Sequence, residues 1–184
     1  ESRKRYIPYP PRRIALVTSV ESAAYADFIK ILSARWPFVT IDMYDVQVQG
    51  DPAPAQLAAA IASASADGDP ADVLVVTRGG GSTDDLAAFN DERVVRAIAA
   101  SRIPTVVAIG HEIDESLFEI AADMRASTPS NAAEFIAPDR TSELASVRQS
   151  GKRLQVSAQA LVLAEHQIII NQRQMLGSQL QRVI

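Results

Sequence analysis

Residues 73–82, VLVVTRGGGS, join an uninterrupted apolar run to an arginine and three glycines. A continuous run of this kind is typical of a strand buried on both faces, as in a parallel sheet. Adjacent glycines destabilise helices and strands, so they indicate a loop whose bare backbone can take positive φ and let another group approach closely. Where such a loop opens a helix, its amides form a concave anion site. We therefore predict that a phosphate approaches this loop.

The same alternation of apolar run and helix recurs on both sides of this stretch. Further buried strands are predicted at residues 13–18, 39–44 and 105–109. Helices are predicted at residues 22–35, 51–66, from about 84, and at 91–100, 115–122 and 130–137. Strands that alternate with helices predict a doubly wound α/β fold, with a mainly parallel four-stranded sheet covered by helices on both faces.

The composition is that of an ordinary globular protein, with 47% apolar and 22% charged residues among 184. The chain contains no cysteine, so it has neither disulfides nor thiolate metal sites. No apolar run reaches the roughly 20 residues needed to cross a bilayer. We expect a cytoplasmic protein without a membrane partner. Because the chain does not begin with methionine, we expect it to be a fragment.

Charge is distributed unevenly along the chain. Residues 1–13 carry five basic groups and one acidic group, and residues 14–138 carry seven basic and eighteen acidic groups. An acidic segment of this kind argues against broad electrostatic binding of nucleic acid by residues 14–138. Affinity for a nucleic acid would have to come from elsewhere.

Residues 139–184 differ in composition from residues 1–138, and we predict a domain boundary between them. Apolar residues recur every seven positions after the boundary: Val147, Leu154, Leu161, Ile168 and Met175. The intervening four-residue offsets are mostly polar or small, so the seam is weaker than that of a strong coiled coil. We predict a long, coiled-coil-like helical extension whose apolar stripe needs a partner.

The glycine loop is the first candidate site, since ligands bind at the carboxyl ends of strands in open parallel sheets. The predicted phosphate-binding residues are Arg78, Gly79, Gly80, Gly81 and Ser82. A plain strand-to-helix turn is the alternative. The loop has neither the lysine of a Walker A motif nor the last glycine of G-x-G-x-x-G, which disfavours a nucleoside triphosphate or a dinucleotide.

His111 is the second candidate, because it follows the predicted strand at 105–109 and precedes Asp114. A histidine there could transfer the proton that phosphodiester cleavage needs, and Asp114 could fix its tautomer. A capping or core histidine is the alternative. Asp27, judged by helical spacing, is a surface partner of Lys30. No spacing specifies a metal site, although Asp27, Glu112 and Asp114 could converge on Mg²⁺.

Several blocks of the sequence together resemble a known family. They are PRRIALVTS, VQG at residues 48–50, TRGGGSTDDLAAFNDERVVRAIAASRIPTVVAIGHEIDE and AADMRASTPSNAAE. Their order and spacing are similar to those of the large subunit of exodeoxyribonuclease VII, over residues 10–138. Carried over by position, the catalytic set of that family falls on Asp27, Arg78, His111 and Asp114. For Asp27, the resemblance reverses the surface interpretation.

The sequence departs from the family pattern at Ser22, Ala26, Ile113 and Glu115. These positions flank the catalytic set, so we expect substrate contacts to differ, whereas the four catalytic positions keep their residue types.

The resemblance implies an exonuclease that degrades single-stranded DNA from either end into oligonucleotides. It also implies an amino-terminal OB-fold domain, absent from this chain, with the basic segment 3–13 near the junction. The helical extension is then expected to bind exonuclease VII small subunits in a hetero-oligomer. No cofactor is required, and Mg²⁺ is compatible with the site. The alternative is a non-catalytic phosphate- or nucleotide-sensing domain on a helical oligomerisation arm.

Overall fold

The chain forms an α/β sheet followed by a long helix, and the computed structural model describes residues 4–79, 83–110 and 116–183. Within these ranges the sheet has five strands, all parallel, in the order β2-β1-β3-β4-β5. They are β1 (Arg13–Thr18), β2 (Thr40–Asp45), β3 (Val73–Thr77), β4 (Thr105–Ala108) and β5 (Met124–Arg125). The predicted doubly wound fold is confirmed, but the predicted strand number is corrected by β5. Its two residues form no apolar run that periodicity could detect.

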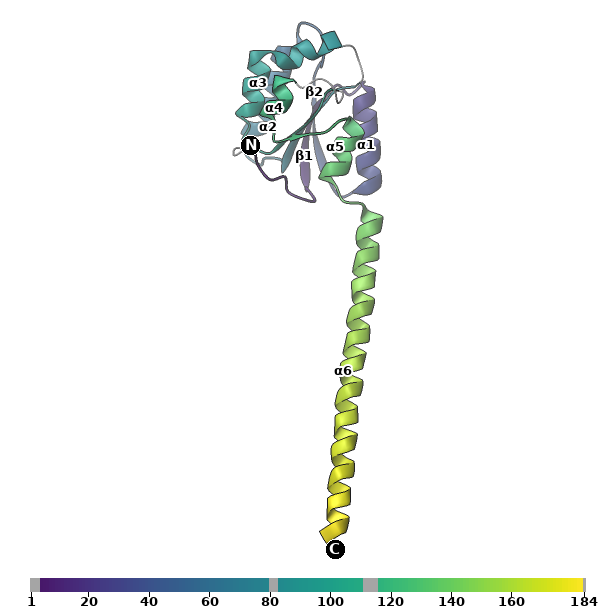
Figure 1. The fold of residues 1–184 in the computed structure, drawn as a ribbon. Helices are drawn as coiled ribbons and strands as arrows, with labels where there is room; N and C mark the ends of the chain where they lie inside the picture. Colours follow the sequence, from purple (N-terminus) through teal and green to yellow (C-terminus); the bar gives the residue numbers. More distant parts are fainter. Residues whose placement is uncertain (1–3, 80–82, 111–115, 184) are drawn as a thin grey trace. The chain divides into compact units, whose positions relative to one another are not determined.

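Helices cover both faces of the sheet (Figure 1). One face carries α1 (Ala23–Arg35) and α5 (Pro129–Ile136), and the other carries α2 (Ala53–Ala66), α3 (Glu92–Ala99) and α4 (Leu117–Ala121). Successive side chains of β3 point to opposite faces, so Val75 joins the core under α1 and Val76 joins the core under α2. Both faces of β3 are therefore apolar, which explains its uninterrupted apolar run.

Side-chain caps fix where the helices begin. At the start of α1 the Oγ of Ser22 accepts the backbone N–H of Tyr25 at 3.2 Å, and at the start of α3 the side chain of Asp91 accepts a backbone N–H at 2.9 Å. Each cap satisfies a donor that the first helical turn leaves without a partner. The helix predicted to resume near Asp84 is the 3-10 helix η1 (Thr83–Asn90).

The chain divides into two compact units, Glu1–Arg140 and Thr141–Ile184. The helical extension predicted from the sequence is the single helix α6 (Arg140–Val183). The apolar residues that recur along α6 every seven positions are exposed: Val147, Leu154, Leu161, Ile168 and Met175. In the three described ranges, no helix is both long enough and apolar enough to span a bilayer.

Charged and polar residues pair with one another at the amino-terminal ends of the strands. Asp123 accepts the backbone N–H and Nη2 of Arg5 at 2.7 and 2.9 Å, and the N–H and Oγ1 of Thr105 at 2.8 and 2.9 Å. Burial raises the pKa of Asp123, but the hydrogen bonds from Arg5 and Thr105 outweigh burial, and this pKa lies below its ordinary value. Arg13, at the start of β1, pairs with Asp42 at 2.7 Å. We call Arg5, Arg13, Thr105 and Asp123 the amino edge.

Candidate active site

A cleft opens at the carboxyl ends of the strands, where the chain changes direction across the sheet. β1 leads outward to β2, whereas β3 leads to β4 on the other side, so the loops after β1 and β3 diverge. Open α/β sheets bind ligands at such a switch point. The cleft has a volume of about 540 Å³. Three loops line it, with Ser19, Glu21, Ser22, Ala23, Gln47, Val48, Gln49, Gly50, Pro52, Arg78 and Gly79.

Arg78, predicted from the sequence to bind phosphate, lies in this cleft. Its backbone N–H donates to the carbonyl oxygen of Ala108 at 3.1 Å, which extends the pairing of β3 with β4 by one residue. Arg78 is only 6% exposed, although it lines the cleft. A cation that is largely withdrawn from water interacts more strongly with an anion than a surface cation does. The guanidinium is therefore well suited to a phosphate group.

Gly79 brings the loop after β3 against the first turn of α1. A Cβ added at Gly79 would lie 3.7 Å from the backbone nitrogen of Ala24, which is an ordinary contact distance. This contact does not require glycine, and the predicted approach of a phosphate stays a prediction. The predicted positive φ is not found at Gly79. Among the described residues, positive φ occurs at Gly50 (84°), in the loop after β2.

Asp27 lies on α1, one turn beyond the cleft. It follows the cleft residue Ala23 by four positions, a spacing that places both residues on one face of the helix. Asp27 is exposed and does not line the cleft. The structure therefore leaves Asp27 near the cleft without placing it inside, and its catalytic role stays a prediction.

The other predicted site residues lie outside the described ranges: Gly80, Gly81, Ser82, His111 and Asp114. The structure describes the residues on both sides of His111 and Asp114: Gly110 is buried after β4, and Ser116 caps α4. The functions assigned to His111 and Asp114 stay predictions.

Two buried hydroxyl groups at the same end of the sheet were not predicted from the sequence. Thr18 and Thr77 are both 0% exposed, and their Oγ1 atoms have no hydrogen-bond partner among the described residues. They follow the paired residues Val17 and Val76, so they are neighbours on adjacent strands and point to the same face. A buried hydroxyl without a partner costs free energy. Strand periodicity gave no signal, because it treats threonine as one more β-branched residue.

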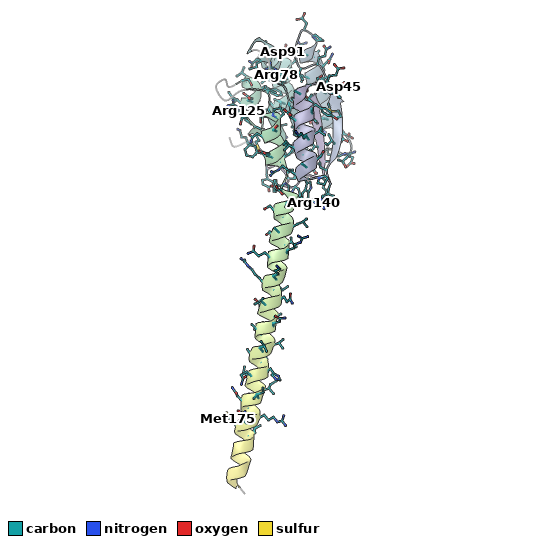
Figure 2. The ribbon with its side chains drawn as sticks, turned by 90° about the vertical axis from the view of Figure 1, so that its right-hand side faces the viewer. Asp45, Arg78, Asp91, Arg125, Arg140 and Met175 are labelled. Carbon is teal, nitrogen blue, oxygen red and sulfur yellow. The ribbon has the colours of Figure 1, made fainter. Side chains whose placement is uncertain are left out.

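Arg125, at the carboxyl end of β5, is a second arginine that sequence reasoning missed. Its Nε donates to Oε1 of Glu119 at 3.1 Å, and the Glu119 side chain is 2% exposed. The other carboxylate oxygen accepts the N–H and Oγ of Ser116 at 3.0 and 3.2 Å, in the capping box of α4. Figure 2 shows Arg78 and Arg125 well removed from Arg140. The block AADMRASTPSNAAE, which contains Arg125, was the available signal.

In the part of the chain that the structure describes, no three His, Asp or Glu side chains are grouped to hold a metal ion. The Mg²⁺ site considered from the sequence would combine Asp27 with Glu112 and Asp114, and the last two residues lie outside the described ranges. Metal dependence therefore stays an open prediction.

Comparison with known proteins gives consistent matches along the chain. A family model described as "Exonuclease VII, large subunit" matches residues 1–184. An exodeoxyribonuclease 7 large subunit of Xanthomonas campestris pv. campestris (strain B100) is 48% identical over 152 residues, which cover 83% of this chain and 34% of the relative. A protein of the same name from Lactobacillus johnsonii is 41% identical over 169 residues, covering 92% of this chain and 37% of the relative. The chain thus spans about a third of the length of the curated relatives that it matches.

Proposed function

Because the chain belongs to the exonuclease VII large-subunit family, we propose that it is the catalytic core of an exodeoxyribonuclease acting on single-stranded DNA. The full-length enzyme hydrolyses phosphodiester bonds from either end of the strand and releases oligonucleotides. The observation that carries this proposal is Arg78, buried and yet lining the switch-point cleft. The alternative, a non-catalytic phosphate sensor, is not favoured, since the relatives are named as subunits of an exodeoxyribonuclease.

The proposed reaction is the attack of water on a phosphodiester. The water oxygen bonds to phosphorus, the P–O bond to the leaving nucleotide breaks, and the leaving oxygen takes up a proton while negative charge grows on the phosphoryl oxygens. Arg78 and the amides of residues 79–81 stabilise these oxygens, as preorganised donors do in other hydrolytic sites. His111 transfers the proton, and Asp114 orients its imidazole. Asp27, one turn from the cleft on α1, positions the attacking water or a cation.

In this proposal the reaction needs no cofactor, and Mg²⁺ is compatible with it. Asp27 supplies an exposed carboxylate on the α1 side, and carboxylate oxygens are the ligands that Mg²⁺ prefers in proteins. The requirement is decided by activity in the presence of a chelator.

The proposed protein partners bind the helical extension α6. The exposed apolar residues of α6 repeat every seven positions, from Val147 to Met175, and water is an unfavourable environment for such a stripe. Exonuclease VII small subunits cover this stripe in the proposed hetero-oligomer. The OB-fold domain expected from the family resemblance supplies most of the affinity for the strand, because residues 14–138 are acidic. A cytoplasmic location stays part of the proposal.

The test is degradation of end-labelled single-stranded DNA by the full-length complex. Strands labelled at the 5′ or the 3′ end are compared with a blunt duplex of the same sequence, each with and without a chelator. The proposal expects short oligonucleotides from both labelled strands and slow attack on the duplex. Tight binding of single strands without any cleavage, in either condition, would support the sensor alternative instead.

A further inference from the structure

Two arginines stand at the carboxyl ends of the strands, separated by one strand. Arg125 of β5 pairs with Val107 of β4, and Val107 pairs with Val76 of β3, two residues before Arg78. Neighbouring strands lie about 4.8 Å apart, so β5 is about 10 Å from β3 across the sheet. The backbones that carry Arg78 and Arg125 are therefore close enough to serve one extended anionic ligand.

The pairing of β5 also decides which way the Arg125 side chain points. Residues directly opposite each other in adjacent strands project to the same face, and Val107 belongs to the core under α2, α3 and α4. Arg125 accordingly contacts Glu119 on α4. The side chain of Arg125 is 29% exposed, so part of it reaches solvent while its partner does not.

The ion pair with Glu119 holds the Arg125 side chain in one orientation. A buried carboxylate is strongly unfavourable unless hydrogen bonds and a cation compensate it. Here Ser116 holds one oxygen and Arg125 holds the other. This contact uses Nε, and Arg125 makes a further interaction besides it. The direction of the whole planar group is thereby set by a helix cap that packs against the sheet.

We propose that Arg125 is a second phosphate-binding residue of the site, positioned by Glu119. It binds the phosphate of the single-stranded DNA that lies next to the cleaved phosphate. This inference rests on the proposed nuclease function. Residues 14–138 hold seven basic groups against eighteen acidic groups, so each arginine at this end of the sheet matters for an anionic strand. Phosphate contacts position a nucleic acid without reading its sequence. The contribution of Arg125 is therefore the same for every base composition.

The test compares three variants of the full-length complex on single-stranded oligonucleotides. Arg125→Gln/Glu119→Gln removes both charges, so that no carboxylate is left buried without a partner. Glu119→Gln removes the support but keeps the cation. Arg102→Gln is the matched control, since it removes one exposed arginine located between α3 and β4, where β4 begins. Thermal unfolding confirms that each variant folds.

The expected result separates phosphate binding from a structural role. The double variant should raise KM about tenfold or more, as for loss of a hydrogen bond to a charged group, while kcat changes less. The slope of log K against log salt should fall in magnitude by about 0.7, the value for one neutralised phosphate on a single strand. Glu119→Gln and Arg102→Gln should keep the wild-type salt slope.

Two outcomes would overturn the inference. One is a double variant that is folded and active with wild-type KM and salt slope. The other is a Glu119→Gln variant whose salt slope falls as far as that of the double variant, because the change in slope would then not come from removing the charge of Arg125. A wild-type complex that binds the oligonucleotide without cleaving it would contradict the proposed function instead. In that case the salt slopes from direct binding still decide the role of Arg125.

Discussion

The two ends of the parallel sheet differ in how their buried threonine hydroxyls are paired. At the amino edge, the Thr105 hydroxyl donates to the Asp123 carboxylate and accepts the backbone N–H of Asp123, each at 2.9 Å. At the carboxyl ends of β1 and β3, the hydroxyls of Thr18 and Thr77 are buried and find no hydrogen-bond partner in the described part of the chain. Arg5 pairs with the Asp123 carboxylate at the amino edge, and Arg78 lines the switch-point cleft at the other end.

The difference separates stability from function. Polar groups that are fully paired hold the sheet together and have little capacity left for a ligand. Polar groups that are buried near a cleft with hydrogen-bonding capacity to spare lower stability, and such groups call for an explanation. Thr18 and Thr77 lie beside the switch point, where α/β sheets bind ligands. At the amino edge, Nε of Arg13 is also buried without a hydrogen bond among the described residues, but it pairs with Asp42 at 2.7 Å. We therefore assign a stabilising role to the amino edge, and the proposed function places the chemistry at the carboxyl end.

The largest expected effect concerns the two histidines. His111→Ala should reduce turnover of single-stranded DNA by about 10²–10⁴, the usual contribution of a positioned proton-transfer group. His166→Ala, on α6, is the matched control and should keep wild-type turnover. Rates at saturating DNA, with circular dichroism as the folding control, measure both variants. Equal activity of the two variants would remove His111 from the site.

A smaller effect is expected at the amino edge, on stability instead of rate. Asp123→Asn should lower the free energy of unfolding by about 1.5–3 kcal/mol, since it weakens charge-assisted hydrogen bonds from Arg5 and Thr105. Turnover per folded molecule should stay unchanged. Chemical denaturation and a rate measurement on the same preparation test this prediction, and a stable but inactive variant would contradict the proposed separation of the two edges.

Acid should abolish the stabilisation that the charge of Asp123 gives the folded protein. The pKa of Asp123 is lowered by folding, so the unfolded chain takes up a proton at higher pH than the folded protein does. The stabilisation is therefore complete above the unfolded value, 3.8, and is lost as the pH falls through the lower folded value. The stability difference between wild type and Asp123→Asn should narrow when denaturation is repeated at decreasing pH below about 4. A constant difference would mean that the charge of Asp123 contributes nothing.

The smallest effects come from a matched pair of substitutions on neighbouring strands. Thr105→Val should destabilise the protein by about 1–3 kcal/mol, because it leaves a buried carboxylate oxygen and an N–H with fewer partners. Thr77→Val should be within about 0.5 kcal/mol of wild type or more stable, because no hydrogen bond is lost. Denaturation curves of the two variants are compared directly. A similar loss in the free energy of unfolding for both variants would show that the Thr77 hydroxyl has a hydrogen-bond partner in solution.

Sequence reasoning recovered what short-range patterns encode. The apolar runs at β3 and β4 predicted buried strands, and the residues after β3 predicted Arg78 at the cleft. β5 was missed because two residues make no pattern, and Arg125 was missed with it. The basic segment 3–13 was expected near the junction with the OB-fold domain, and its contacts within the chain were not predicted. Arg5 pairs with Asp123, 118 residues away, and no local pattern encodes a contact over that distance.

The most direct test of the account is the turnover of Arg78→Ala beside that of Asp123→Asn, both in the full-length complex at saturating single-stranded DNA. The account predicts that folded Arg78→Ala loses about 10²–10³ in rate, the usual cost of removing one preorganised stabilising group. Asp123→Asn should lose stability and keep the wild-type rate. A folded Arg78→Ala variant with wild-type turnover would contradict the assignment of catalysis to the carboxyl end of the sheet.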